Sequence, residues 1–340
     1  MDIYLFDHEK YKYFYNCSMY TTEQWNSFGV RRPGLGIFSI MAGSFAIILY
    51  IPCAKTMLLP ELWKLPCYRL MFLNSIIDIL GLLNSCVVSG YLSIEGVVYC
   101  SYPDFLYIYG SFIMGLWAAQ CMTAFILGIN RCVEFWQHRF LAGLFEGYKM
   151  AFWWVVVIAY FFVFFMFTGS CPYNTIVNMW MTDPYLGIPE IKADRSWYEN
   201  LKLVNMNNTG VFVGLSSCYI FLVVSIWLRR RMTGSVALSK IQRQVSIQAC
   251  IICSFICITG GMYVFFELFP ELASPIFIII DFLSWQCGFY GVITCYMVMN
   301  RTLRRGVIGF YLRLIGYVPD PEMTSTMMTV TVVGTSIYVP

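Results

Sequence analysis

Charged residues are scarce in this chain, and their scarcity argues against several kinds of protein. Asp, Glu, Lys and Arg together make up 12% of the 340 residues, whereas a soluble domain has roughly 25%. The chain has two histidines, too few for an intramembrane metallohydrolase that holds its metal with several of them. The net charge of +3 gives no sign of a nucleic-acid partner. We therefore expect neither an enzyme nor a cofactor or metal site.

Long apolar segments take the place of charge, since 59% of the residues are hydrophobic. A bilayer core of roughly 30 Å is crossed by about 20 helical residues. Seven segments have that length, and only Asp78 and Asp281 place a charge inside them. They are residues 34–54, 70–94, 105–130, 151–168, 211–228, 245–266 and 276–299. The sequence therefore predicts an all-α membrane protein, a seven-transmembrane helix bundle surrounded by membrane lipid.

The expected bundle spans residues 34–300, and three further parts flank it. Residues 1–33 have no apolar core of the kind found in a cleaved signal peptide, and we expect an extracellular N-terminal segment. In residues 301–316, apolar and basic residues alternate at helical spacing, which predicts a short amphipathic helix on the membrane surface. Residues 317–340 are expected to be a disordered cytosolic tail.

The distribution of basic residues predicts how the bundle is oriented. Most of the 22 Lys and Arg residues fall on one side of the expected membrane, the cytosolic side if the N-terminus is outside. The three consecutive arginines from Arg229 to Arg231 make the difference between the two sides decisive. We therefore expect a multi-pass plasma-membrane protein with a cytosolic C-terminus. Two glycosylation sequons, at Asn16 and Asn207, then lie outside, whereas a third, at Asn300, lies inside.

Most of the 14 cysteines lie inside the expected spans, where cysteine acts as a small apolar residue. Cys17, Cys100 and Cys171 fall outside them. Cys100 just precedes the third span and Cys171 just follows the fourth, which favours a Cys100–Cys171 disulfide and leaves Cys17 over. The alternative is three free thiols or a different pairing.

Several ordered motifs resemble those of a known family. Arg131, in the pair Asn130-Arg131, resembles the Asp-Arg-Tyr position of G-protein-coupled receptors. The other motifs are Tyr15-Asn16-Cys17 with Trp25, Tyr50-Ile51-Pro52-Cys53 with Met57, Cys67-Tyr68-Arg69-Leu70-Met71, and the segment from Tyr296 to Arg304. From about residue 15 to residue 304, the set resembles the nematode serpentine receptor class T family of chemoreceptors. The resemblance implies a seven-helix receptor in the ciliary membrane of sensory neurons that detects an extracellular small molecule and signals through a heterotrimeric G protein.

An expected G-protein coupling switch centres on Arg131. An arginine at the membrane edge can be held by polar groups or released to bind a partner's carbonyl groups. Because Asn130 replaces the usual acid, we expect no fixed ion pair, and restraint through hydrogen bonds or packing. Alternatively, Arg131 merely extends to the lipid headgroups. The expected coupling residues are Asn130, Arg131, Glu134, Arg229, Arg230, Arg231, Tyr296 and Asn300.

Asp78 is expensive to place in a membrane, at roughly 2.5–3.5 kcal/mol if it stays ionised. It shares a helical face with Asn74. Asp78 and Gln120 each lie about 16 Å above the inner surface, by the rise per residue of a helix, and should meet. The site is either a buried polar switch, with sodium as one ligand, or a protonated Asp78 hydrogen-bonded for packing.

Asp281 lies near the outer end of the seventh span, and Ser284 and Trp285 share its helical face. A carboxylate beside an aromatic plane suits an amine or another polar small molecule. The alternative is a solvated rim residue, with the neighbouring aromatic side chains in the core. The expected pocket residues are Asp281, Ser284, Trp285, Tyr263, Met114 and Trp117.

The residues of the expected spans also bear on other functions that a seven-helix protein can have. Residues 276–299 contain no Lys, which excludes a retinal pigment. A ligand-gated ion channel or a transporter remains an alternative, although no repeat in the hydropathy pattern favours a transporter. A receptor-like partner protein that no longer couples is another. The sequence leaves homo- and hetero-oligomers open.

Overall fold

The computed structural model describes residues 1–136, 139–188, 191, 196–199, 202–232, 251–252, 254–265, 269, 272 and 274–317. The first residues of the expected sixth span, 245–250, lie outside the described residues. The same holds for residues 318–340 of the expected tail.

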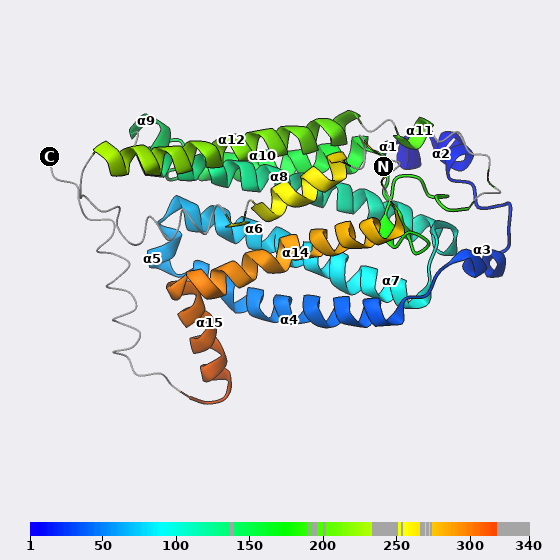
Figure 1. Cartoon of the computed structure of the whole chain (residues 1–340), viewed down its shortest axis with the longest axis horizontal. Coiled ribbons are helices and arrows are strands. Elements are labelled where there is room, and N and C mark those ends of the chain that lie inside the picture. Colours follow the sequence, from blue (N-terminus) through cyan, green and yellow to red (C-terminus); the bar gives the residue numbers. More distant parts are fainter. Residues whose placement is uncertain are drawn as a thin grey trace.

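Long apolar helices lie side by side and form the body of the molecule (Figure 1). Six of the described helices are long and apolar enough to cross a membrane, and a shorter apolar helix, Ser254–Phe265, lies within the expected sixth span. The long helices are α4 (Pro33–Met57), α6 (Pro66–Leu82) with its continuation through the π-helical turn η1 (Leu83–Val88) into α7 (Ser89–Glu95), α8 (Pro103–Trp136), α10 (Lys149–Phe167), α12 (Lys202–Met232) and α14 (Pro275–Met299). The predicted helix bundle is confirmed.

Proline and glycine mark where these helices begin and end. Helices α4, α6, α8 and α14 each begin with proline, whose fixed φ and missing N–H suit the first helical turn. Helix α7 ends at Gly96, which has a φ of +75°. Glycine adopts this left-handed conformation without steric cost, so the chain can turn sharply there.

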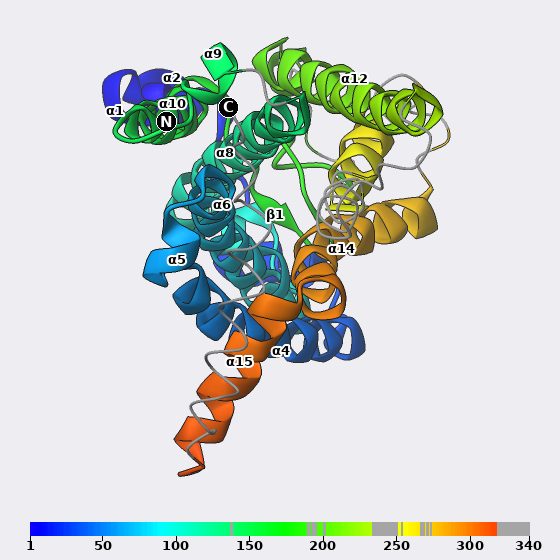
Figure 2. The same ribbon diagram turned by 90° about the vertical axis from the view of Figure 1, so that its left-hand side faces the viewer.

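Helix α8 is the central helix of the bundle, in contact with α6, α10 and α12 (Figure 2). Of its apolar window, 72% is buried, compared with 17% for α10. The exposed face of α10 carries large apolar side chains such as Phe152, Val155 and Phe162. This face suits contact with lipid, whereas α8 is enclosed by protein.

Helix α15 (Arg301–Leu314) follows α14 and runs across the bundle axis at the end far from Met1 (Figure 1). The Asn300 side chain caps it by accepting a hydrogen bond from Leu303 N at 3.1 Å. Leu303 and Val307 are buried, whereas Ile308 and Leu314 are exposed. A helix therefore forms where the amphipathic pattern predicts one, and its placement on a membrane surface stays a prediction.

Short helices and one hairpin join these elements. The strands β1 and β2 form an antiparallel pair in which Tyr173 faces Trp180. Thr175 N donates to Val97 O at 3.1 Å, which fixes the hairpin against the end of α7. The short elements are α1 (Asp2–Phe6), α2 (His8–Phe14), α3 (Thr22–Phe28), α5 (Pro60–Trp63), η2 (Tyr99–Ser101), α9 (Arg139–Ala142), β1 (Tyr173–Asn174), β2 (Met179–Trp180) and α11 (Ser196–Glu199).

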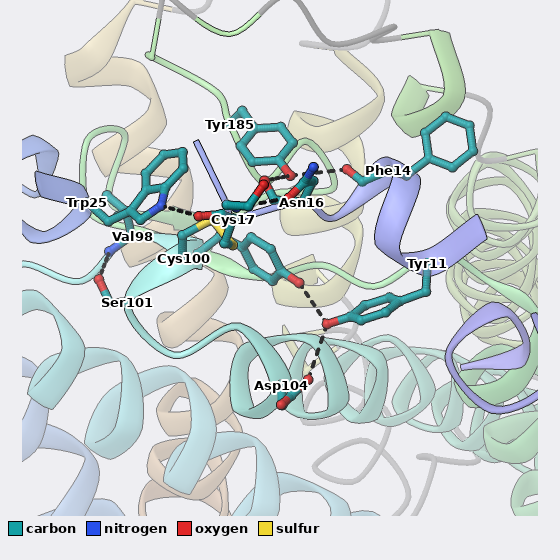
Figure 3. The surroundings of a disulfide bond; sticks show 12 residues. Tyr11, Phe14, Asn16, Cys17, Trp25, Val98, Cys100, Ser101, Asp104 and Tyr185 are labelled. Carbon is teal, nitrogen blue, oxygen red and sulfur yellow. Dashed lines mark hydrogen bonds between the residues drawn. A yellow bond between two sulfur atoms is a disulfide. The ribbon is translucent and has the colours of Figure 1, made fainter. Parts of the chain in front are cut away.

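The N-terminal segment packs over one end of the bundle, which we call the N-terminal end. Trp25 is 1% exposed, and its indole Nε1 donates to Cys17 O at 2.9 Å (Figure 3). Tyr185, from the connection after α10, donates its hydroxyl to Asn16 O at 2.9 Å. The segment and the connection therefore form one layer across this end.

The disulfide joins Cys17 to Cys100, so the expected Cys100–Cys171 bridge is wrong (Figure 3). Cys17 reaches Cys100 because the N-terminal segment folds back over η2. Cys171 is a buried thiol whose pKa is raised by burial to about 12. Its carbonyl oxygen lies so close to α8 that a Cβ on Gly110 would come within 2.5 Å of it. The bridge therefore ties the N-terminal segment, rather than the connection after α10, to the start of α8.

Asn207 lies within α12, and its burial contradicts the expected glycosylation of this residue. Its side chain is 5% exposed. It accepts a hydrogen bond from Tyr160 at 3.1 Å and donates one to Asn208 at 3.1 Å. A glycan on Nδ2 would have no room while the side chain stays in this buried position. Asn16 is exposed and stays a candidate acceptor.

We expect the double variant Cys17→Ser/Cys100→Ser to be less stable by roughly 2–4 kcal/mol, because the bridge closes a loop of 83 residues. Thermal unfolding of the purified protein measures the change. Cys171→Ser is the matched control and should have a smaller effect. Peptide mapping without reductant should recover a Cys17–Cys100 peptide, and a Cys100–Cys171 peptide would contradict the pairing.

Candidate functional site

A cavity of about 140 Å³ lies inside the bundle near its N-terminal end. Its walls come from α8, the β1–β2 hairpin, α12, helix Ser254–Phe265 and α14. Five of the six expected pocket residues line it: Met114, Trp117, Tyr263, Asp281 and Trp285. The sixth, Ser284, is absent from the lining, and its carbonyl accepts a hydrogen bond from Thr259 at 3.4 Å. The structure thus brings together side chains from three helices that are far apart in sequence.

Asp281 is 6% exposed, so it is no solvated rim residue, and that alternative is wrong. Its Oδ1 atom has no hydrogen-bond partner among the described residues. Asp281 is also the sole charged side chain in the described lining. A buried carboxyl oxygen without a partner is costly in a water-poor interior, and such a group commonly marks a functional site.

The hairpin supplies lining residues that sequence reasoning missed, namely Met179, Trp180, Met181 and Thr182. Trp180 is held by a hydrogen bond from its Nε1 to Ser89 Oγ at 2.8 Å. The proline-rich connection predicts a turn-rich lid, but its sequence gives no sign of which side chains face inward. Only the pairing of β1 with β2 and their contact with α7 decide this.

Helix α12 holds the Trp117 side chain in place at another part of the cavity wall. Its Asn208 accepts a hydrogen bond from Trp117 Nε1 at 2.8 Å. The same Asn208 oxygen accepts from Asn207 Nδ2 at 3.1 Å. This chain of bonds fixes the indole ring at the cavity wall and leaves its N–H unavailable to a ligand.

A second, outer cavity of about 340 Å³ lies between the N-terminal segment and the connection after α10. Thr182 lines both cavities, so they are neighbours. The outer cavity is lined by charged as well as aromatic side chains, including Asp2, Lys10 and Trp197. It lies at the N-terminal end of the bundle.

Asp78 lies in a fully buried polar cluster between the cavity and the far end of the bundle. Its Oδ2 accepts hydrogen bonds from Tyr50 at 2.7 Å and from Asn74 at 2.5 Å. Its Oδ1 accepts from Gln120 Nε2 at 3.2 Å. The three side chains Asp78, Asn74 and Gln120 therefore meet as expected. Either of its two interpretations, switch or packing, is compatible with three donors around one carboxyl group.

Tyr50 was missed as a member of this cluster, although it lies in one of the motifs of the family resemblance. It joins because α4 packs against α6, a contact that one sequence does not reveal. The ring of Tyr296 lies edge-on to Tyr50, with 6.5 Å between centroids. The Tyr296 hydroxyl has no partner among the described residues. Tyr296 thereby connects the Asp78 cluster to the end of α14.

Arg131 forms an ion pair with Glu134 on its own helix, with 2.9 Å between Nη1 and Oε2. The expectation of an arginine without a fixed ion pair is therefore wrong. The spacing of three residues explains the contact, because such residues are neighbours on a helix surface. Nη2 of Arg131 also lies 4.0 Å from Met71 Sδ. Asn130 is buried, and its Oδ1 has no partner in the described part of the chain.

The remaining expected coupling residues lie near the same end of the bundle. Arg229, Arg230 and Arg231 fall in the last turns of α12, and their side chains are outside the described residues. Asn300 is buried between α14 and α15, and its Nδ2 donates to the Tyr68 hydroxyl at 3.4 Å.

Comparison with solved structures defines the class of this bundle. The crystal structure of squid rhodopsin is similar, with a TM-score of 0.55 and 15% sequence identity, over 92% of this chain and 90% of that chain. At this level of identity the likeness shows the fold alone. The fold is therefore a rhodopsin-like bundle of membrane-spanning helices.

Sequence comparison then gives the family. Residues 2–315 match the family model described as serpentine type 7TM GPCR chemoreceptor Srt, and the chain belongs to this family. Serpentine receptor class T-55 of Caenorhabditis elegans is 26% identical over 239 residues, which cover 69% of this chain and 63% of that protein. The match thus spans less than two thirds of this relative. The expected family is confirmed, and with it a multi-pass membrane protein of receptor type.

We expect Tyr50→Phe to lower stability by about 1–2 kcal/mol, because Asp78 loses a buried donor while the ring contact with Tyr296 is kept. The thermal unfolding midpoint of the purified protein measures the loss. Tyr91→Phe is the matched control, since the Tyr91 side chain is 54% exposed. Equal midpoints for the two variants would show that the hydrogen bond to Asp78 contributes nothing.

Proposed function

We propose that this protein is a G-protein-coupled chemosensory receptor that binds an extracellular small molecule in the inner cavity. The observation that carries the proposal is that one central helix, α8, takes part in both sites. Met114 and Trp117 line the cavity, and Arg131 with its ion pair lies on the same helix. Trp117 and Arg131 are about 21 Å apart along α8, which is most of the thickness of a bilayer core.

A path of buried contacts between the two sites supports the proposal. Gln120, one turn from Trp117 on α8, donates to Asp78. Asp78 is bonded to Tyr50, whose ring meets Tyr296 on α14. Helix α14 also carries Asp281 and Trp285 at the cavity. A ligand that binds one arrangement of α8 and α14 more tightly than another shifts the population toward it.

The ion pair between Arg131 and Glu134 is weak enough for Arg131 to leave Glu134 and bind a G protein instead. Arg131 is 13% exposed and Glu134 is 38% exposed, so the pair lies at the edge of the protein. Pairs of this kind contribute only about 0–1 kcal/mol. A G protein that offers backbone carbonyls to Arg131 therefore competes with a weak restraint. In this proposal, movement of helix Ser254–Phe265 away from α8 opens the space for the G protein.

The proposed orientation places the N-terminal end of the bundle outside the cell, in the plasma membrane and, by family resemblance, in the ciliary membrane of sensory neurons. The excess of Lys and Arg at the other end supports it. The Cys17–Cys100 disulfide gives independent support, because disulfides form in oxidising compartments and are rare in the cytosol.

Glycosylation of the expressed receptor tests this orientation. We expect a glycosidase-sensitive shift on a gel that Asn16→Gln removes, because Asn16 is exposed at the proposed outer end. Asn207→Gln and Asn300→Gln should leave the shift unchanged, since Asn207 is buried and Asn300 lies at the other end. A shift that depends on Asn300 would mean that the bundle is inverted.

Coupling is tested by nucleotide exchange on a G protein in membranes with matched surface expression. We expect Arg131→Ala to lower basal or compound-evoked exchange about tenfold or more, because charge-assisted hydrogen bonds to the G protein are lost. Glu134→Gln should raise basal exchange, since it removes the restraint on Arg131. Arg313→Ala, which changes an exposed arginine at the end of α15, is the matched control.

Two results would contradict the proposed coupling. Compound-evoked ion current or uptake without exchange, unaffected by Arg131→Ala, would identify a channel or transporter. Compound binding with no exchange on any G protein would identify a receptor-like partner protein instead.

A further inference from the structure

We propose that the inner cavity takes a small organic cation, an ammonium compound whose charged head lies against Asp281. The inference rests on the proposed receptor function for its biological meaning and adds the chemical class of the ligand. It concerns direct binding, so it is tested without a G protein.

The first argument is charge. Asp281 is 6% exposed, and its Oδ1 atom has no partner among the described residues. No Lys, Arg or His contributes to the described lining, so the protein supplies no cation of its own there. A buried carboxylate is stabilised strongly by a nearby positive charge, because the surroundings screen it poorly. An ammonium ligand supplies that charge, whereas an anionic ligand would be repelled.

The second argument is the aromatic lining. Trp117, Trp180, Tyr263 and Trp285 come from four different elements and surround one small space. Aromatic rings attract ammonium groups through the negative potential of their faces, and cages of such rings bind quaternary ammonium compounds. A carboxylate together with several aromatic rings is therefore matched to a cation with apolar substituents.

The third argument is that three hydrogen-bond donors at the wall are already used by the protein. The Nε1 atoms of Trp117 and Trp180 donate to Asn208 and Ser89. The Thr259 hydroxyl donates to the carbonyl of Phe255 at 3.0 Å. A ligand that needs donors from the protein, such as a carboxylate or phosphate, finds these three occupied. A ligand that brings its own positive charge needs none of them.

Size is compatible with this class. A volume of about 140 Å³ is several times the roughly 30 Å³ that one water occupies in the liquid, so the cavity has room for a compact group such as tetramethylammonium. The flexible thioether side chains of Met114, Met179 and Met181 also line the space and can adjust to a slightly longer ligand such as choline.

The experiment measures binding of choline and tetramethylammonium to the full-length receptor in lipid nanodiscs by isothermal titration calorimetry. The neutral comparison ligand is 3,3-dimethylbutan-1-ol, in which a carbon replaces the charged nitrogen of choline. We expect choline to bind about tenfold or more tightly than this alcohol, because only choline gains the cation–π and charge interactions. This comparison uses the unmodified protein and does not depend on the folding of a variant.

A variant then locates the charge. Asp281→Asn should weaken choline binding about tenfold or more and leave binding of the alcohol unchanged, since only the cation interacts with the carboxylate charge. Asp104→Asn is the matched control, because it removes an exposed carboxylate at the same end of the bundle, outside the cavity lining. It should leave both affinities unchanged.

Three results would overturn the inference: no binding of either ammonium compound, equal affinity for choline and the alcohol, or choline binding that Asp281→Asn does not change. These results are distinct from failure of the proposed function. Choline binding that depends on Asp281, without nucleotide exchange, would leave the ligand class in place and remove the coupling. Nucleotide exchange evoked by neutral compounds alone would support the coupling and remove the proposed ligand class.

Discussion

The absence of water from the bilayer core is the constraint on which this structure depends. Every polar group at that depth must find a partner inside the protein. The backbone meets this demand by forming helices, and buried polar side chains meet it by gathering around α8 and α6. Asp78 shows the result most clearly, since Tyr50, Asn74 and Gln120 all donate to its carboxyl group. Because these donors come from three helices, satisfying one carboxyl group also fixes how the helices pack.

The same constraint lets one helix, α8, connect the two proposed sites. Helix α8 is enclosed by its neighbours, so a shift at one end is resisted along its length and has to be matched by α6, α10 or α12. The Asp78 cluster lies between the sites and has a limited number of hydrogen-bond arrangements. Such a cluster is the kind of element that can exist in two discrete states, which coupling between distant sites requires.

Some of this could be predicted from the sequence, and the reasons differ from residue to residue. The spans follow from length and apolarity, which are properties of the chain alone. The meeting of Asp78 and Gln120 follows from the fixed rise of a helix. The partner of Cys17 depends on how the N-terminal segment folds over η2, and the hairpin lining depends on strand pairing. Neither contact follows from the spacing of residues in the sequence. The Arg131–Glu134 pair could have been predicted from the sequence, since residues three apart are neighbours on a helix surface.

The two buried aspartates differ in whether the protein itself supplies hydrogen-bond partners for the carboxyl group. Asp78 is surrounded by donors, so its cluster adds to the stability of the bundle. Asp281 is also buried, at 6% exposed, yet its Oδ1 has no partner among the described residues. A group that costs stability persists where it serves another purpose. In the proposed receptor, that purpose is to keep the Asp281 carboxyl group available for an interaction with the ligand. Binding then relieves an unfavourable state of the free protein, and this difference in free energy is available to shift the arrangement of α8 and α14.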